Sequence, residues 1–158
     1  TDDGADVVTF LLAANPGEAA RPLARAASGG ELARTMLAVR LVTSGAPPTQ
    51  VFDEVDAGIG GEAGAAVGRR LADLGAAHQV LCVTHLAQVA AYADAQIVVE
   101  KGERGGRTVA GAVVVDGEDR IRELSRMLAG LEASDHARRH AEELLAGARR
   151  PLRAGGRR

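Results

Sequence analysis

Hydrophobic residues along this chain occur either in short uninterrupted runs, typical of strands, or three to four residues apart, typical of helices. Runs rich in β-branched residues predict strands at 7–14, 79–84, 96–100 and 108–115, and a central strand that ends at 51–52. Helical spacing predicts helices at 28–43, 86–92, 120–128 and 135–146, and another that carries Val67, Leu71 and Leu74 and ends near Gly75. The alternation predicts an α/β fold, a mostly parallel sheet flanked by helices.

Details of these runs predict how the strands are arranged. The run at 79–84 lacks polar alternation, so we expect it to be buried on both faces of a parallel sheet. A turn at 103–106 joins two strands that we expect to be antiparallel. Residues 18–27 are predicted to form an irregular connection. In such sheets ligands bind beyond the carboxyl ends of the strands, so a site is expected at that edge.

Composition narrows the class of protein. With 158 residues, 46% of them hydrophobic, the chain can form one domain, and 2% aromatic residues require an aliphatic core. The net charge of -2 provides no overall attraction to nucleic acid, and a single cysteine, Cys82, excludes an internal disulfide. No run reaches the roughly 20 apolar residues that span a bilayer. We expect a domain at 1–148 and a basic, disordered tail at 149–158, and the start at Thr1 suggests a fragment.

Two adjacent carboxylates, Asp53 and Glu54, follow the central strand and precede a glycine-rich loop. At such a strand end one carboxylate can hold Mg²⁺ while its neighbour polarises an attacking water, as in nucleotide hydrolases. The alternative is a solvated exit from the strand. His85 follows the next parallel strand, so the same edge of the sheet is expected to carry both features.

The segment Ser28-Gly29-Gly30-Glu31 matches the S-x-x-E capping box at the start of a helix. Capping alone would explain the serine and the glutamate. The two glycines also allow a phosphate to approach the N–H groups at the positive end of the helix dipole. Both interpretations remain open from these residues alone.

Other combinations are weaker. Cys82, His85 and His78 make a poor zinc site because the sequence offers no clear fourth ligand. His136 and His140 are predicted to be surface residues. Residues 58–63 satisfy G-x-G-x-x-A, but three acids lie between the strand and these glycines and would repel a pyrophosphate. We therefore do not expect a dinucleotide site.

Three motifs in order resemble the signature loop, Walker B strand and switch-histidine loop of ABC-type ATPases: residues 27–31, 51–54 and 84–85. The longer segments 52–61 and 81–91 resemble the C-terminal head segment of the RecN family of SMC-like DNA repair ATPases. The resemblance covers most of residues 6–148. Transporter ATPases usually have Pro-Thr after the Asp-Glu pair and Gln after the signature glycines, so Val55-Asp56 and Glu31 favour the SMC-like branch.

This resemblance implies a role for each site residue. Asp53 would be the Mg²⁺ residue, Glu54 the catalytic carboxylate and His85 the sensor of the ATP γ-phosphate. The signature-loop residues Ser28, Gly29, Gly30 and Glu31 would act on ATP held by a partner head. Asp56 and Gly58, the first residue of the D-loop region at 58–61, would be the other nucleotide-contacting residues.

The resemblance also implies partners. Lys101 is the only lysine and lacks a P-loop frame, and no coiled coil occurs; in the family both lie upstream. We therefore expect the C-terminal lobe of an ATPase head that hydrolyses ATP in double-strand-break repair and is inactive alone. Its partners would be the N-terminal lobe, a second head and DNA, in the bacterial cytoplasm near the nucleoid and without a membrane. The alternatives are a stand-alone structural or dimerisation module, or a lobe of another SMC-like or transporter ATPase.

Overall fold

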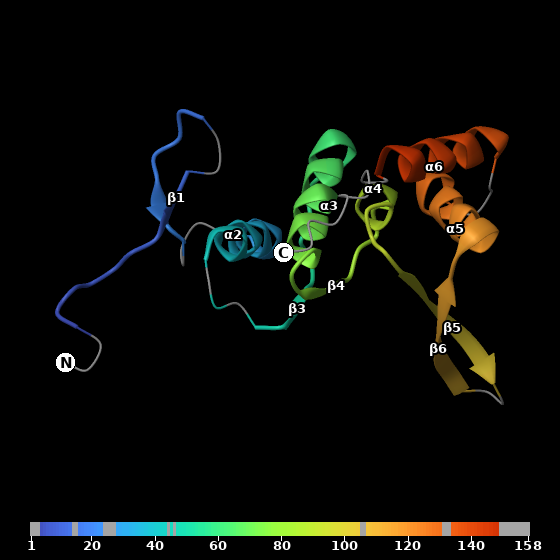
Figure 1. Cartoon of the computed structure of the whole chain (residues 1–158), viewed down its shortest axis with the longest axis horizontal. Helices are drawn as coiled ribbons and strands as arrows, with labels where there is room; N and C mark the ends of the chain where they lie inside the picture. The colour runs from blue at the N-terminus through green and yellow to red at the C-terminus, as the bar shows by residue number, and fades with distance from the viewer. Residues whose placement is uncertain are drawn as a thin grey trace, which may run out of the picture.

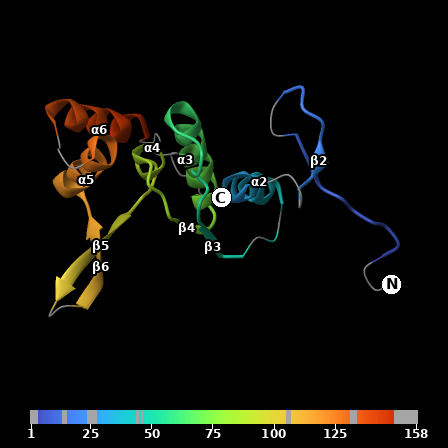
Figure 2. The same cartoon turned by 180° about the vertical axis from the view of Figure 1, so that it is seen from behind.

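The computed structural model describes residues 4–13, 16–23, 28–43, 45, 47–104, 107–130 and 134–148, without the side chains of residues 103, 104 and 107. The elements follow one another along the long axis of the molecule, from β1 near the N-terminus to α5 and α6 (Figure 1), and the opposite view agrees (Figure 2). In chain order they are β1 (Leu11–Leu12), β2 (Arg21–Pro22), α2 (Gly29–Val42), β3 (Thr49–Phe52), α3 (Gly61–Gly75), β4 (Gln79–Cys82), α4 (Ala87–Ala90), β5 (Gln96–Arg104), β6 (Arg107–Val115), α5 (Gly117–Ala129) and α6 (Asp135–Ala148).

The strands form three pairs within the described residues. β3 and β4 are parallel, with Phe52 opposite Cys82, which confirms the α/β class and the pairing expected at the centre. The other two described pairs are antiparallel, so the described strands do not form the mostly parallel sheet that we expected. β5 and β6 are antiparallel, as expected, because only residues 105–106 separate them and such a short connection permits only a hairpin. The predicted turn at 103–106 was too long, since β5 runs on to Arg104; residues 105–106 themselves lie outside the described part.

The N-terminal prediction was partly wrong. Within the predicted strand 7–14, only Leu11–Leu12 is a strand, and Val7 and Phe10 are exposed. Its partner, β2, lies inside the stretch that we expected to be irregular. Pro22 has no N–H to donate, but hydrogen bonding continues past it, because the N–H of Leu23 donates to the Phe10 carbonyl at 2.8 Å. Residues 14 and 24–27 lie outside the described part.

The expected burial of the central strands on both faces was also wrong. Val51 is 67% exposed and Leu81 48% exposed, while Phe52, the next residue along β3, is buried. Neighbouring strand residues point to opposite faces, so the described helices cover one face of the β3–β4 pair and leave the other open. Continuous apolar runs do not distinguish this arrangement from burial on both sides, because the uncovered residues are also apolar.

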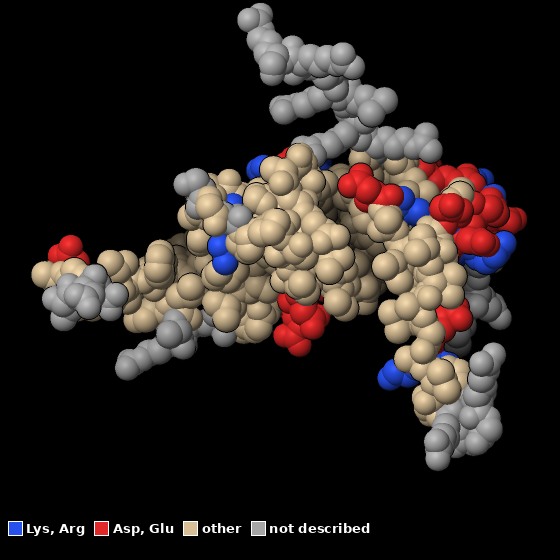
Figure 3. Space-filling view, turned by 60° about the horizontal axis from the view of Figure 1, so that its bottom comes forward, with Lys and Arg blue, Asp and Glu red and all other residues tan. Residues whose placement is uncertain are grey.

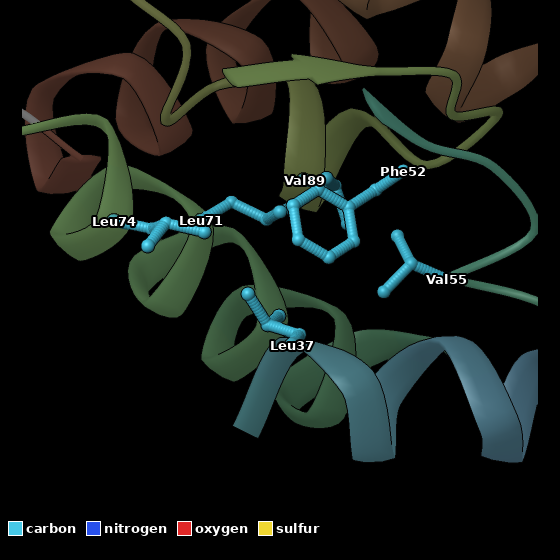
Figure 4. Close-up of a cluster of buried hydrophobic side chains, with 6 residues drawn as sticks. All are labelled: Leu37, Phe52, Val55, Leu71, Leu74 and Val89. Atoms are coloured by element: carbon cyan, nitrogen blue, oxygen red, sulfur yellow. The ribbon is translucent and has the colours of Figure 1, made fainter. Parts of the chain in front are cut away.

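Two aliphatic core clusters hold the helices in place. The first joins α2, β3, the following loop, α3 and α4 (Figure 4) through Leu37, Phe52, Val55, Leu71, Leu74 and Val89. The second joins α4, α5 and α6 through Ala87, Ala90, Ala91, Leu124 and Ala141. Because α4 contributes to both clusters, it connects the β3–β4 region to the C-terminal helix pair.

Candidate functional site

The carboxylate pair lies where β3 ends. The N–H of Val83 donates to the Phe52 carbonyl at 2.9 Å, so the β3–β4 ladder continues up to Asp53. The backbone N–H of Glu54 then donates to Asp53 Oδ1 at 2.9 Å, and both acidic residues are exposed. Glu54 has a φ of 56°, a left-handed conformation that is costly for a residue with a side chain and is concentrated at functional sites.

The start of α2 lies beside this carboxylate pair. The predicted capping box is confirmed: the N–H of Glu31 donates to Ser28 Oγ at 3.3 Å, and the N–H of Ser28 donates to Glu31 Oε2 at 3.1 Å. Ser28 and Gly29, the first residues of this helix start, are exposed. A β-carbon added to Gly29 would lie 2.5 Å from Glu54 Oε2. The side chain of Glu54, the candidate catalytic residue, therefore lies against the candidate signature loop.

Gly30 has a different neighbour from Gly29. A β-carbon at Gly30 would lie 2.7 Å from the Ala57 carbonyl oxygen and 3.0 Å from the Ala57 β-carbon. Gly30 is also buried, whereas Gly29 is exposed. The lack of a side chain at Gly30 therefore allows α2 to pack closely against the loop after β3. This packing role was not predicted from the sequence.

Arg34 is a residue of this region that the sequence reasoning missed. Its guanidinium donates to the carbonyls of Val55 at 3.2 Å and Ala57 at 2.8 Å, on either side of Asp56. Cations are disfavoured near a helix N-terminus. An arginine only six positions after the N-cap Ser28 is therefore a weak indication, in the sequence, that its side chain has a specific partner. Through this side chain, α2 determines the path of the loop between β3 and α3.

Asp56 is buried, with 3% of its surface exposed. Its Oδ2 accepts hydrogen bonds from the Thr84 hydroxyl at 2.5 Å and the His85 N–H at 3.0 Å, and lies 3.1 Å from His85 Nδ1. Burial by itself would raise the pKa of Asp56, but the hydrogen bonds from Thr84 and His85 and the charge of His85 lower it below 3.8. The carboxylate is therefore ionised around neutral pH.

His85 lies at the same edge as Asp53 and Glu54, as expected from two adjacent parallel strands. Its side chain is 71% exposed, and only Nδ1 is engaged by the carboxylate of Asp56. Gly58, in the turn after Asp56, is exposed with a φ of 73°, a conformation that favours glycine. The structure thus gathers the candidates from three segments at one edge, with Glu54 and His85 open to solvent and Asp56 inside.

The donor atoms fit a magnesium ion better than zinc. Asp53 offers an exposed carboxylate at a strand end, and Mg²⁺ in nucleotide sites is commonly held by one or two carboxylates together with phosphate and water oxygens. Burial raises the pKa of the Cys82 thiol to about 11, which disfavours the thiolate that zinc requires. In the part of the chain that the structure describes, no three His, Cys, Asp or Glu side chains form a metal-binding group.

The other motifs considered in the sequence do not form sites of the kinds they suggest. Residues 53–60 separate β3 from α3, so the glycines of the G-x-G-x-x-A segment do not form the immediate strand-to-helix turn of a dinucleotide fold. His136 and His140 are exposed on α6, as the surface interpretation expected. None of the helices that the structure describes combines the length and the apolar character needed to cross a membrane.

Sequence comparisons relate the chain to DNA repair proteins, although no protein-family model matches it. It is 60% identical over 148 residues to the DNA repair protein RecN of Streptomyces coelicolor, which covers 92% of this chain and 26% of that relative. RecN of Mycobacterium leprae is 53% identical over 150 residues and RecN of Deinococcus radiodurans 51% over 144 residues, covering 94% and 91% of this chain. The chain spans about a quarter of the length of these curated relatives.

A structural comparison agrees with the expected fold. A solved structure described as "Structural biochemistry of ATP-driven dimerization and DNA stimulated activation of SMC ATPases" is similar, with a TM-score of 0.50 and 21% sequence identity. The match covers 77% of this chain and 81% of that one. At this identity the similarity establishes a shared fold, and it confirms the α/β architecture expected for an ABC-type ATPase lobe.

Proposed function

We propose that this chain, a RecN-type segment, forms the C-terminal lobe of an SMC-like ATPase head that binds and hydrolyses ATP in recombinational repair of DNA double-strand breaks. The observation that carries the proposal is the convergence of Asp53, Glu54, His85 and the start of α2 at one edge of the β3–β4 pair. The similarity to RecN supplies the repair context. The protein would act in the bacterial cytoplasm, at the nucleoid.

Each exposed side chain at this edge has a distinct role in the proposal. Asp53 would hold Mg²⁺, which when bound neutralises charge on the phosphates. The Glu54 carboxylate, held at the strand end by its unusual backbone conformation, would orient and polarise the attacking water. The exposed ring of His85 would contact the γ-phosphate.

The signature loop would act on ATP held by a second head. Ser28, Gly29 and Gly30 begin α2, where free N–H groups and the helix dipole favour an anion, and Glu31 keeps Ser28 in place. In the proposal, Asp56 and Gly58, the first residue of the D-loop region, lie next to the nucleotide. This assignment requires head dimerisation, because a signature loop would complete the site of the opposite head.

Exposed apolar surface supports a missing neighbour, which we propose to be the N-terminal lobe that carries the P-loop. A groove of about 460 Å³ lies between α2 and β3, lined by Leu32 and Met36 among others, and the buried amide Nε2 of Gln50 has no hydrogen-bond partner among the described residues. Hydrophobic side chains on β3, on the segment after β4 and on the hairpin are also exposed: Val51, Val83, Ile97, Val99 and Val114. Extended exposed apolar surface of this kind marks an interaction site.

DNA contact would come from other parts of the full-length protein. In Figure 3 acidic and basic atoms gather toward the α5–α6 end, a separate acidic patch lies near the middle of this face, and only scattered basic atoms lie elsewhere on it. The same apolar surface is the one observation that favours the competing proposal of a structural or dimerisation module. The presence or absence of a P-loop and long heptad repeats upstream in the same reading frame separates the two.

A first experiment compares this chain with the full-length protein. Because the lobe supplies the metal and water-polarising residues but no lysine loop for the phosphates, we expect no Mg²⁺-dependent ATP hydrolysis by the purified chain. The full-length protein should release phosphate. Turnover by the chain itself that is abolished by Glu54→Gln would contradict the split-head proposal.

A second experiment tests the action of the signature loop across a dimer. In the full-length protein, Ser28→Arg should leave ATP binding to one head nearly intact but abolish head engagement and hydrolysis, whereas Ser28→Thr, which keeps a capping hydroxyl, serves as the matched control. Mixing Ser28→Arg heads with heads mutated at the P-loop lysine should restore partial activity, because one composite site in each mixed dimer carries neither defect. No recovery, with both variants folded and associating, would favour Ser28 as a helix cap only.

A further inference from the structure

Asp56 joins the loop after β3 to the segment after β4 through a single atom. Its Oδ2 accepts from the Thr84 hydroxyl and from the His85 N–H and lies 3.1 Å from His85 Nδ1. The Thr84 hydroxyl in turn accepts from the N–H of Leu86 at 3.1 Å. The backbone and the ring of His85 are therefore held by the same carboxylate oxygen.

Burial distinguishes the two members of this pair. Asp56 is 3% exposed and directs its bonded oxygen toward the His85 segment, whereas the His85 side chain is 71% exposed. A buried carboxylate costs free energy unless its hydrogen bonds are satisfied, so the cluster orders both segments. Arg34 strengthens this order, because it binds the carbonyls that flank Asp56.

We propose that Asp56 is a positioning residue for His85: it holds Nδ1 so that Nε2 is the ring nitrogen presented to the nucleotide. This inference rests on the proposed function, in which His85 contacts the γ-phosphate. It gives Asp56 a role behind the histidine in place of a direct nucleotide contact. A hydrogen bond at one ring nitrogen determines which nitrogen carries the proton, so a neutral His85 carries its proton on Nδ1.

The chemical consequence concerns the donor at Nε2. With Nδ1–H directed at Asp56, a neutral ring has a lone pair at Nε2 and cannot donate to an anionic phosphate oxygen. Donation from Nε2 therefore requires a proton on that nitrogen as well, which the ring can take from solvent. Asp56 thereby determines the direction of the ring and which nitrogen faces the phosphate.

The direct test is the ring tautomer of His85, measured by long-range ¹H–¹⁵N NMR on this chain labelled at its four histidines. His85→Gln assigns the signals. At about pH 9, well above the ordinary histidine pKa of about 6.5, we expect the wild-type ring to carry its proton on Nδ1. A wild-type ring protonated on Nε2 would overturn the proposal, whether or not any variant folds.

Variants separate positioning from general stability. Asp56→Ala should shift the proton to Nε2, whereas Asp56→Asn should retain it on Nδ1, because the amide oxygen can still accept from the ring nitrogen that lies 3.1 Å from Oδ2. Asp119→Asn, which removes an exposed carboxylate paired with Arg122, is the control and should leave the spectrum unchanged. An unchanged tautomer in folded Asp56→Ala would contradict the proposal.

Activity of the full-length protein provides a second readout. There, Asp56→Ala should lower kcat by roughly 10- to 100-fold, the usual effect of losing a side chain that orients a functional group, with ATP binding retained. Asp56→Asn should recover most of kcat. If the full-length protein proves inactive, the proposed function fails, while the NMR result still decides the positioning role. Equal losses of kcat in Asp56→Ala and Asp56→Asn would contradict the proposal that an acceptor oxygen at this position is enough to orient His85.

Discussion

Both ends of the molecule have an apolar core and arginine contacts, and the buried carboxylate of Asp56 distinguishes the β3–β4 end. At the α5–α6 end, Leu124 and Ala141 have no exposed surface, Arg120 donates to carbonyls of α4, and Arg138 pairs with Glu118. At the β3–β4 end, the loop that carries the candidate site is held by Arg34 and by the buried carboxylate of Asp56. Apolar packing stabilises without specifying direction, whereas hydrogen bonds specify the position of each atom.

The difference explains how the site end can be ordered and yet open. Glu54 and His85 are exposed, so neither is fixed by a surrounding core. Their positions follow from backbone and second-layer contacts: the left-handed conformation of Glu54, and the bond between Asp56 and His85. Substitutions of the exposed residues Glu54 and His85 should therefore change chemistry with little loss of stability, and substitutions in the α5–α6 core should do the reverse.

The largest expected effect is that of Glu54→Gln in the full-length protein. Removing the carboxylate that polarises water should lower ATP hydrolysis on the order of 10²- to 10⁴-fold with ATP binding retained. Phosphate release and nucleotide binding measure the two properties. Asp53→Asn should in addition weaken Mg²⁺-dependent binding, and near-normal hydrolysis by Glu54→Gln would refute the role given to this residue.

The largest expected loss of stability lies at the opposite end. Leu124→Ala creates a cavity in a fully buried position and should lower the free energy of unfolding by about 2–5 kcal/mol. Leu32→Ala is the matched control, because Leu32 is 44% exposed and loses less packing. Urea denaturation of this chain compares the two, and equal losses would show that the α5–α6 core is not the stabilising unit.

An intermediate effect distinguishes the two signature glycines. Gly30→Ala would place its methyl group against the Ala57 backbone and should cost about 1–3 kcal/mol, typical of overpacking. Gly29→Ala meets only the end of the Glu54 side chain, which can move, so stability should change little. The same denaturation experiment measures both; a Gly29 variant as unstable as the Gly30 variant would contradict this division.

The smallest expected effect is the loss, at low pH, of the contribution of Asp56 to the free energy of unfolding. Because the folded-state pKa of Asp56 lies below its ordinary value of 3.8, its contribution to stability is present above that value and is lost as pH falls through the folded pKa. Wild type should therefore lose more stability than Asp56→Asn as the pH is lowered from about 5 toward 3. Parallel losses in urea titrations at these pH values would show that Asp56 is not ionised within a satisfied cluster.

The sequence by itself determined what depends on near neighbours. The capping box of Ser28 and Glu31, the helix that follows it, and the carboxylate pair at the end of β3 were all predictable. They follow from local hydrogen bonding and hydrophobic spacing, which act over three or four residues. The parallel pairing of β3 with β4 followed from the helix between them, and with it the shared edge for Asp53, Glu54 and His85.

Only the tertiary structure decided which of these residues face inward. Asp56 meets Thr84 across 28 positions of sequence, and Arg34 meets Ala57 across 23, so neither contact leaves a local pattern. The same holds for the open face of β3 and β4, because apolar side chains look alike whether helices cover them or not. The burial of a carboxylate and the approach of Gly30 to a backbone depend on how distant segments pack, and packing is a property of the folded chain as a whole.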